Sequence, residues 1–186
     1  MRKVTALTLL CAAMFCATLT AQSDALQYTS DGQMVLPKDY RQWVFLSAGL
    51  GMTYKADATP NANPPFENVF VNPAAYQEFL KTGVWPDKSV LLLEVRASES
   101  RVSINKNGRV QSKILHIEGH VKDNAKGGWA FYGFKDGAQK GTLFPKTADC
   151  YSCHSENGAV DTTFVQFYPT LVDPAKKFGK YKETGH

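Results

Sequence analysis

Short apolar runs separated by turn residues make up most of the chain after residue 40. They are rich in β-branched and aromatic residues and are shorter than most helices, which is typical of β-strands. We expect strands at residues 42–46, 68–71, 89–95, 112–121 and 129–134. Asn107-Gly108 predicts a hairpin turn between a run at 102–104 and Val110, and glycines at 127–128 and 137 predict turns around the last strands.

One segment between these strands has a helical pattern. Asn72 is a preferred N-cap, Pro73 suits the first helical position, and we expect the helix to reach Leu80. Residues 57–65 are rich in Pro, Asn and Ala and predict a loop. The pattern as a whole predicts an α+β fold, predominantly an antiparallel β-sheet with a few short helices.

The first residues follow a different pattern, because Arg2 and Lys3 precede an apolar run that ends near Leu19. A membrane-spanning helix needs about 20 apolar residues, and this shorter run gives way to polar residues as in a secretory signal. We expect residues 1–21 to be a cleaved signal peptide and residues 22–186 to be a single exported, periplasmic domain. Cleavage after Ala25 and retention as an uncleaved anchor are the alternatives.

Charge excludes one class of partner. The chain has a formal net charge of +4, and loss of Arg2 and Lys3 with the signal lowers it to +2. A nearly neutral chain without a basic stripe gains little from the phosphates of a nucleic acid, so no such partner is expected. Lysines at positions 176, 177, 180 and 182 form either a solvated tail or a docking patch for an acidic redox partner.

The cysteines carry the strongest chemical signal. Cys11 and Cys16 leave with the signal, so the mature chain keeps only the pair in Cys150-Tyr151-Ser152-Cys153-His154. This spacing is the attachment pattern of a c-type haem. On a helical turn both sulfurs lie on one face and can each add to a porphyrin vinyl group, while His154 ligates the iron. Thr147 is the expected N-cap of that helix, with Asp149 in the first turn.

A thioredoxin-like redox pair and a zinc site are the alternatives for these cysteines. A redox pair would open a βαβ unit, which the C-terminal position does not offer. Zinc would need further ligands, and only His116, His120 and His186 remain. The preceding strands also exclude small all-helical and four-helix-bundle cytochromes. We therefore expect one covalently attached haem c on a C-terminal helical segment.

Segments spread over nearly the whole mature chain carry a family resemblance: residues 36–43, 70–76, 81–83, 121–123, 128–132, 150–154 and 164–169. In this order they resemble the cytochrome P460 family. The resemblance implies an exported homodimer built on an antiparallel sheet, with a five-coordinate haem c whose open face binds small nitrogen species. One branch of the family oxidises hydroxylamine and joins a lysine covalently to the porphyrin. The other, cytochrome c′-β, lacks that bond and binds nitric oxide.

The resemblance implies a position for that lysine and for a carboxylate near the iron. Aligned on Lys81-Thr82-Gly83, the lysine position falls on Leu93, so the cross-link is expected to be absent; Lys88, the nearest lysine, lies in the turn before the strand. Glu118 matches the distal carboxylate of oxidising members. There it would accept protons from hydroxylamine, and an apolar pocket would raise its pKa. A glutamate that faces solvent is the alternative.

Other residues are candidates for the surroundings of the haem. The resemblance to cytochrome c′-β implies a cap of bulky phenylalanines, for which Phe45 and Phe70 are the candidates; core packing is their alternative role. The candidates for a sixth iron ligand are His116, His120 and Met52. The candidates for contacts with the propionates or the ring are Arg41, Trp129 and Tyr132.

These features predict a periplasmic, monohaem c-type cytochrome of the c′-β kind, whose open iron site binds nitric oxide and similar small nitrogen species. Oxidation of hydroxylamine or nitric oxide, with Glu118 as the proton acceptor, is the second hypothesis. A simple electron carrier with six-coordinate iron is the third. A redox partner protein and a second copy of the chain are the expected macromolecular partners.

Overall fold

The computed structural model describes residues 26–54, 57–59 and 61–184. The predicted signal peptide, residues 1–21, lies outside the described residues. Within the described part of the chain, no helix combines the length and the apolar character needed to cross a membrane.

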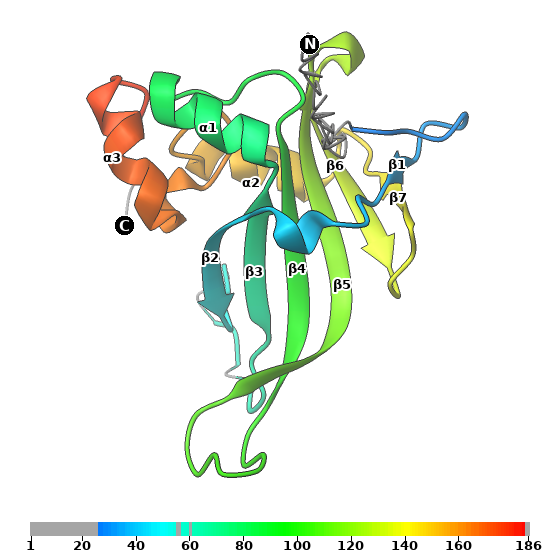
Figure 1. The fold of residues 1–186 in the computed structure, drawn as a ribbon, viewed down its shortest axis with the longest axis vertical. Coiled ribbons are helices and arrows are strands. Elements are labelled where there is room, and N and C mark those ends of the chain that lie inside the picture. The colour runs from blue at the N-terminus through cyan, green and yellow to red at the C-terminus, as the bar shows by residue number, and fades with distance from the viewer. Residues whose placement is uncertain (1–25, 55–56, 60, 185–186) are drawn as a thin grey trace, which may run out of the picture.

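An antiparallel sheet of seven strands forms the centre of the fold, in the order β1-β7-β6-β5-β4-β3-β2 (Figure 1). Its strands are β1 (Met34–Val35), β2 (Val44–Leu50), β3 (Phe66–Val71), β4 (Val90–Glu99), β5 (Val110–Asp123), β6 (Gly128–Lys135) and β7 (Lys140–Leu143). Three short helices, α1 (Pro73–Thr82), α2 (Asp149–Asn157) and α3 (Pro169–Lys177), gather towards one end of the sheet (Figure 1). The predicted α+β class is confirmed.

The most apolar run of the sequence becomes the central strand β4. Val90, Leu91 and Leu92 are all buried, although neighbouring side chains on a strand point to opposite faces. Such a run is expected where both faces of a sheet are covered. The two faces of this sheet are therefore packed against different parts of the chain.

Residues 26–43 cross one face of the sheet, which we call the N-terminal face (Figure 1). Met34, Trp43 and Leu92 belong to its buried cluster. The opposite face, which we call the helical face, packs against α1, α3 and residues 159–168. There Phe79 of α1 lies against Trp85 with ring centroids 4.3 Å apart, in one cluster with Leu171 of α3.

The predicted helix at 72–80 is confirmed as α1, with Asn72 at the N-cap and Pro73 at the first position. The Asn72 side chain makes no capping bond to the helix. Its Oδ1 accepts a hydrogen bond from Val90 N at 2.9 Å and ties the helix start to β4. Gly83 ends the helix with φ of 72°, a conformation that glycine adopts without steric cost.

Two details of the strand prediction are wrong. Residues 102–104 form no strand, because residues 100–109 make up the connection between β4 and β5, and Arg101 and Ser103 have φ near +55°. That backbone is incompatible with a regular strand. Strand β2 begins at Val44 rather than residue 42, because Tyr40–Gln42 is a 3-10 turn. The glycine turns at 127–128 and 137 lie where the sequence predicts them.

Candidate functional site

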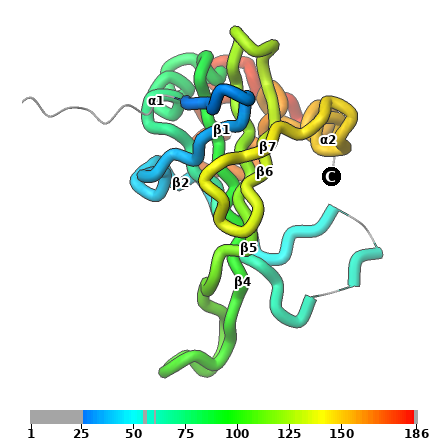
Figure 2. Tube along the Cα trace, turned by 90° about the vertical axis from the view of Figure 1, so that its right-hand side faces the viewer, coloured from blue at the N-terminus to red at the C-terminus, as the bar shows by residue number. Residues whose placement is uncertain are grey.

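A cavity of about 500 Å³ lies between the helical face of the sheet and helix α2. Side chains from β2 to β6 form its floor, while α2 and residues 164–168 form a wall and Met52, Tyr54 and Pro65 close a further side. Figure 2 shows α2 and the described residues 51–54 and 61–65 on the same side of the sheet. The volume is within the range of small-molecule and cofactor sites.

Helix α2 carries the cysteine motif into this cavity. The helix begins at Asp149 and its N-cap is Ala148, so the predicted Thr147 cap is wrong. The start shifts because Ala148 closes a turn, in which its N–H donates to Pro145 O at 2.9 Å. Asp149 lies in the first turn as predicted, where a carboxylate interacts favourably with the helix dipole.

Cys150 and Cys153 both line the cavity and carry free thiols. They are three residues apart on one helix and therefore project to the same side. Burial raises the pKa of the Cys150 thiol. Reactive cysteines of redox enzymes have lowered pKa values, so this environment disfavours the thioredoxin-like alternative.

His154 presents one ring nitrogen to the cavity. Its Nδ1 lies 2.8 Å from Thr162 O, and because a carbonyl can only accept, Nδ1 carries the proton. That tautomer leaves a lone pair on Nε2, the arrangement found in metal-ligating histidines. Burial lowers the pKa of His154, which keeps the imidazole neutral at pH 7. Phe164 and Phe131 pack against the ring at centroid distances of 4.2 and 4.7 Å.

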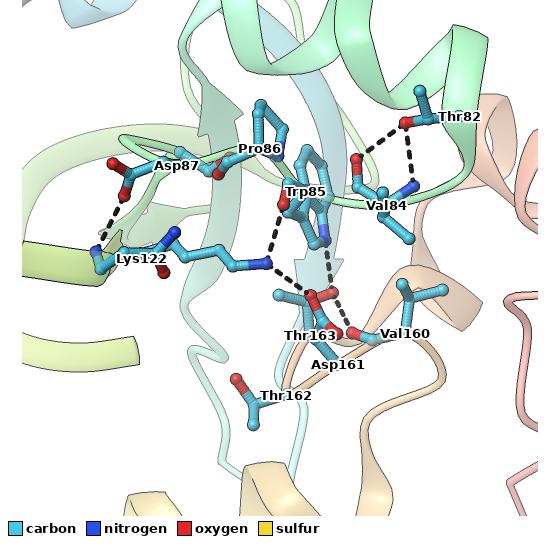
Figure 3. A network of polar contacts seen from close by, with 12 residues as sticks. Thr82, Val84, Trp85, Pro86, Asp87, Lys122, Val160, Asp161, Thr162 and Thr163 are labelled. Atoms are coloured by element: carbon cyan, nitrogen blue, oxygen red, sulfur yellow. Dashed lines mark hydrogen bonds and ion pairs between the residues drawn. The ribbon is translucent and has the colours of Figure 1, made fainter. Parts of the chain in front are cut away.

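The carbonyl that orients His154 belongs to a turn at residues 160–163. Val160 and Thr163 exchange backbone hydrogen bonds across it, and the Trp85 indole Nε1 donates to Thr163 Oγ1 at 2.8 Å. Lys122 Nζ lies 3.2 Å from Asp161 Oδ2 in the same turn (Figure 3). Side chains from β5 and from the segment before β4 thus hold the turn in place.

The residues around the cavity fit a c-type haem. Two thiols and an imidazole nitrogen with a free lone pair are the groups that hold such a cofactor, and α2 places all three at one apolar cavity. Leu93 lines the cavity, as its alignment predicts. Among the described lining residues there is no lysine, and Lys88 instead pairs with Asp123.

Glu118 lies on the cavity floor, and its side chain is 41% exposed. Its carboxylate therefore faces the cavity as well as solvent. Its Cα partner on β4 is Leu93, and its Oε1 is 3.6 Å from His116 Nε2. Glu67 is a second carboxylate of the cavity, which the sequence did not single out. Burial, and then the charge of Glu118, raise the pKa of Glu67. Alternation could not have identified Glu67, because the sequence suggested Phe70 for the cavity side and residues 67 and 70 point to opposite faces of a strand.

The candidates for a sixth ligand differ in their positions. His116, His120 and Met52 all line the cavity, but His116 is engaged by Glu118. His120 lies beside His154, edge-on, with ring centroids 4.9 Å apart, and its Nε2 is hydrogen-bonded to Thr162 Oγ1 at 3.1 Å. His120 therefore packs against the candidate iron ligand. Burial holds its pKa well below the usual range, so it is neutral.

The prediction that Phe45 and Phe70 cap the cavity is wrong. Both rings lie on the N-terminal face, packed together at 5.7 Å, and neither lines the cavity. A bulge between Phe45 and Ser47 sends Ser47 to the cavity side instead. Arg41 binds Glu94, and Tyr132 is buried in the cluster of the N-terminal face, so both lie away from the cavity.

Trp129 differs from those residues, because it lies on the helical face against His120, with ring centroids 4.3 Å apart. Its indole Nε1 is buried and has no hydrogen-bond partner among the described residues. Buried donors are normally paired, so this one is available to a group that enters the neighbouring space.

Comparison with known proteins gives one result on the family. A search of curated proteins finds no match. The family model for cytochrome P460 matches residues 37–165, which include the strands β2–β7, helix α1 and the cysteine motif of α2. The match covers more than half of the chain. The protein therefore belongs to the cytochrome P460 family.

Proposed function

We propose that the protein is a periplasmic, monohaem c-type cytochrome that binds nitric oxide in the cavity at α2. Cys150 and Cys153 hold the haem as thioethers, and His154 ligates its iron through Nε2. The bound haem supplies an iron with an open position for a small nitrogen species. The family supports a haem-binding cytochrome, and the motif on a cavity-lining helix supports this mode of attachment.

The composition of the cavity lining carries the choice of ligand. Leu93 and Val69 provide apolar surface, and the lining residues that the structure describes include no lysine or arginine, whereas Glu67 and Glu118 are acidic. These side chains add no positive charge to that of the iron, so they give an anion such as nitrite no attraction of their own. Binding of a neutral diatomic such as nitric oxide does not depend on a positive charge in the lining. Leu93 also leaves no amine for a covalent bond to the porphyrin, which supports the c′-β branch.

Glu118 favours hydroxylamine oxidation as the second candidate function. Its carboxylate lines the cavity beside His116, where it could accept a proton from a nitrogen substrate while an external electron acceptor takes the electrons. His116 is 45% exposed and would pass the proton to solvent. The histidines give a simple electron carrier no comparable support, because His116 pairs with Glu118 and His120 packs beside His154. Met52, which lines the cavity, is the remaining candidate for a sixth ligand.

Replacing Glu118 by Gln separates the two candidates. The proposal predicts that the wild-type protein binds nitric oxide but consumes no hydroxylamine in the presence of an electron acceptor. It also predicts that Glu118→Gln changes nitric oxide affinity by less than about threefold, because a neutral ligand interacts weakly with a carboxylate. Stopped-flow binding and a turnover assay measure both, with Glu78→Gln on the exposed side of α1 as the control.

Turnover of hydroxylamine by the wild type, with its loss in Glu118→Gln and its retention in Glu78→Gln, would instead assign the protein to the oxidising branch. The proposal also includes export through the signal at residues 1–21 and a homodimer, as the family resemblance implies. Mass spectrometry of the periplasmic protein gives the cleavage site, and sedimentation gives the oligomeric state.

A further inference from the structure

Lys122 lies at the centre of the contacts that hold the 160–163 turn. It is on β5, two residues beyond His120, and its backbone is fixed in the sheet by Lys122 N to Ser89 O at 2.9 Å. The side chain is only 20% exposed. Its ammonium donates to Trp85 O at 2.8 Å and to Asp161 Oδ2 at 3.2 Å (Figure 3).

Three branches lead from this ammonium to Thr162. The first is direct, since Asp161 precedes Thr162 in the chain. The second passes through Trp85, whose indole nitrogen holds Thr163 on the other side of Thr162. The third is a stack in which Lys122 Nζ lies 5.6 Å from the ring centroid of Trp129, Trp129 packs on His120, and His120 Nε2 bonds to Thr162 Oγ1.

The turn needs such support because its backbone is unfavourable. Asp161 has φ of 52°, which costs free energy for a residue with a side chain. The turn also packs closely against the end of α2 at Gly158. A Cβ atom at that position would lie 2.7 Å from His154 O and 2.9 Å from Thr162 C, so only glycine fits there. Side chains outside the turn therefore help its own backbone hydrogen bonds to set the position of Thr162 O relative to His154.

We propose that Lys122 is a positioning residue for His154, which sets the strength of the Nδ1–H···O=C bond to Thr162 and thereby the strength of the histidine–iron bond. A strong bond at Nδ1 makes the imidazole a more basic ligand and stabilises the ferric form. Loss of the Lys122 contacts weakens the hydrogen bond at Nδ1 and thereby favours the ferrous form. This inference rests on haem c being present, but not on nitric oxide being the ligand.

Lys122→Met tests the inference, because methionine keeps the length and apolar stem of lysine and loses the ammonium. Two quantities are measured on the holoprotein: the iron–histidine stretching frequency of the ferrous form by resonance Raman spectroscopy, and the reduction potential. We expect the frequency to fall and the potential to rise. Loss of a positive charge by itself would lower the potential, since reduction adds an electron. A rise in potential therefore indicates the loss of the contacts to the turn rather than the loss of charge.

Lys146→Met is the matched control. Lys146 Nζ donates to Trp129 O at 2.7 Å, so this change also removes a cation next to Trp129, but it makes no contact with the 160–163 turn. We expect an unchanged frequency and an unchanged or lower potential. An equal fall in frequency in Lys146→Met, or no fall in Lys122→Met, would overturn the inference.

Asp161→Asn keeps the test decisive if Lys122→Met does not fold. Its carboxylate is 36% exposed, so the substitution is mild, and it removes the ion pair from the other side. We expect a smaller fall in frequency than in Lys122→Met, because the branches through Trp85 and Trp129 remain. A double variant should equal Lys122→Met alone, because the ion pair is already lost there. Additive effects would contradict the proposed action of Lys122 through the turn.

The two proposals fail in different ways. A wild-type protein without haem would refute the proposed function, whereas an unshifted iron–histidine band in the holoprotein of Lys122→Met would refute only the role of Lys122.

Discussion

Replacing Cys150 and Cys153 together by Ser is expected to abolish covalent haem attachment. A hydroxyl does not add to a porphyrin vinyl group as a thiol does, and after the signal these are the two remaining cysteines of the chain. The wild-type protein should keep its haem through denaturing electrophoresis and acidic acetone extraction. The double variant should lose all of it, and each single variant should keep one thioether bond.

Ser152→Ala is the control within the motif. Its hydroxyl donates to Asp149 O at 3.0 Å inside the first turn of α2, so its loss perturbs the same helix without removing a sulfur. This variant should keep its haem through denaturation. Haem that stays covalently bound when both cysteines are gone would refute the attachment site.

Leu93→Phe is expected to slow the association of nitric oxide and carbon monoxide by about tenfold, equivalent to about 1.4 kcal/mol in the barrier. Leu93 lines the cavity beside Glu118 and Val69, its Cα partners on the neighbouring strands. A larger ring there fills space that a ligand needs, because packed interiors have few voids to absorb it. Flash photolysis of the carbon monoxide complex measures the effect directly.

Phe45→Ala is the matched control for the cavity. Phe45 is 52% exposed and lies on the N-terminal face, so its truncation should change the association rate by less than about twofold. Unchanged rates in Leu93→Phe would contradict the position of the ligand site. Faster binding in Phe45→Ala would restore the phenylalanine cap that the sequence suggests.

The strands were predictable because their apolar runs and turn residues are local signals. The long run that forms β4 and the Asn72-Pro73 start of α1 are examples. The short strands β1 and β7 escaped prediction, because two to four residues carry too little pattern. Helix α3 was missed as well, since its lysines suggested a tail, although Leu171 and Ala175 are fully buried.

The face of a side chain was harder to predict than its strand. The family resemblance implies a phenylalanine cap and makes Phe45 and Phe70 its candidates, but both faces of this sheet are covered, so apolar character does not show which face a side chain takes. The bulge after Phe45 further changes the alternation. Glu118 was predictable because the family resemblance aligns it with a distal carboxylate, and it does line the cavity.

The cysteine motif predicted the candidate iron ligand, but not what supports it. Thr162, Trp85 and Lys122 are far from His154 in sequence, or separated from it by an irregular turn, and only the fold brings them together. Hydrogen bonds to a backbone carbonyl leave no mark in the side-chain sequence. The orientation of His154 was therefore beyond sequence reasoning.

The most direct test of the central claim is the visible spectrum of the exported protein, recorded ferric, ferrous, and ferrous with carbon monoxide. An open haem c site without a lysine cross-link predicts an ordinary high-spin c-type spectrum that shifts when the gas is added. A strongly red-shifted ferrous Soret band would reveal a modified macrocycle and contradict the reading of Leu93. A spectrum that carbon monoxide leaves unchanged would contradict the open site and indicate a six-coordinate electron carrier.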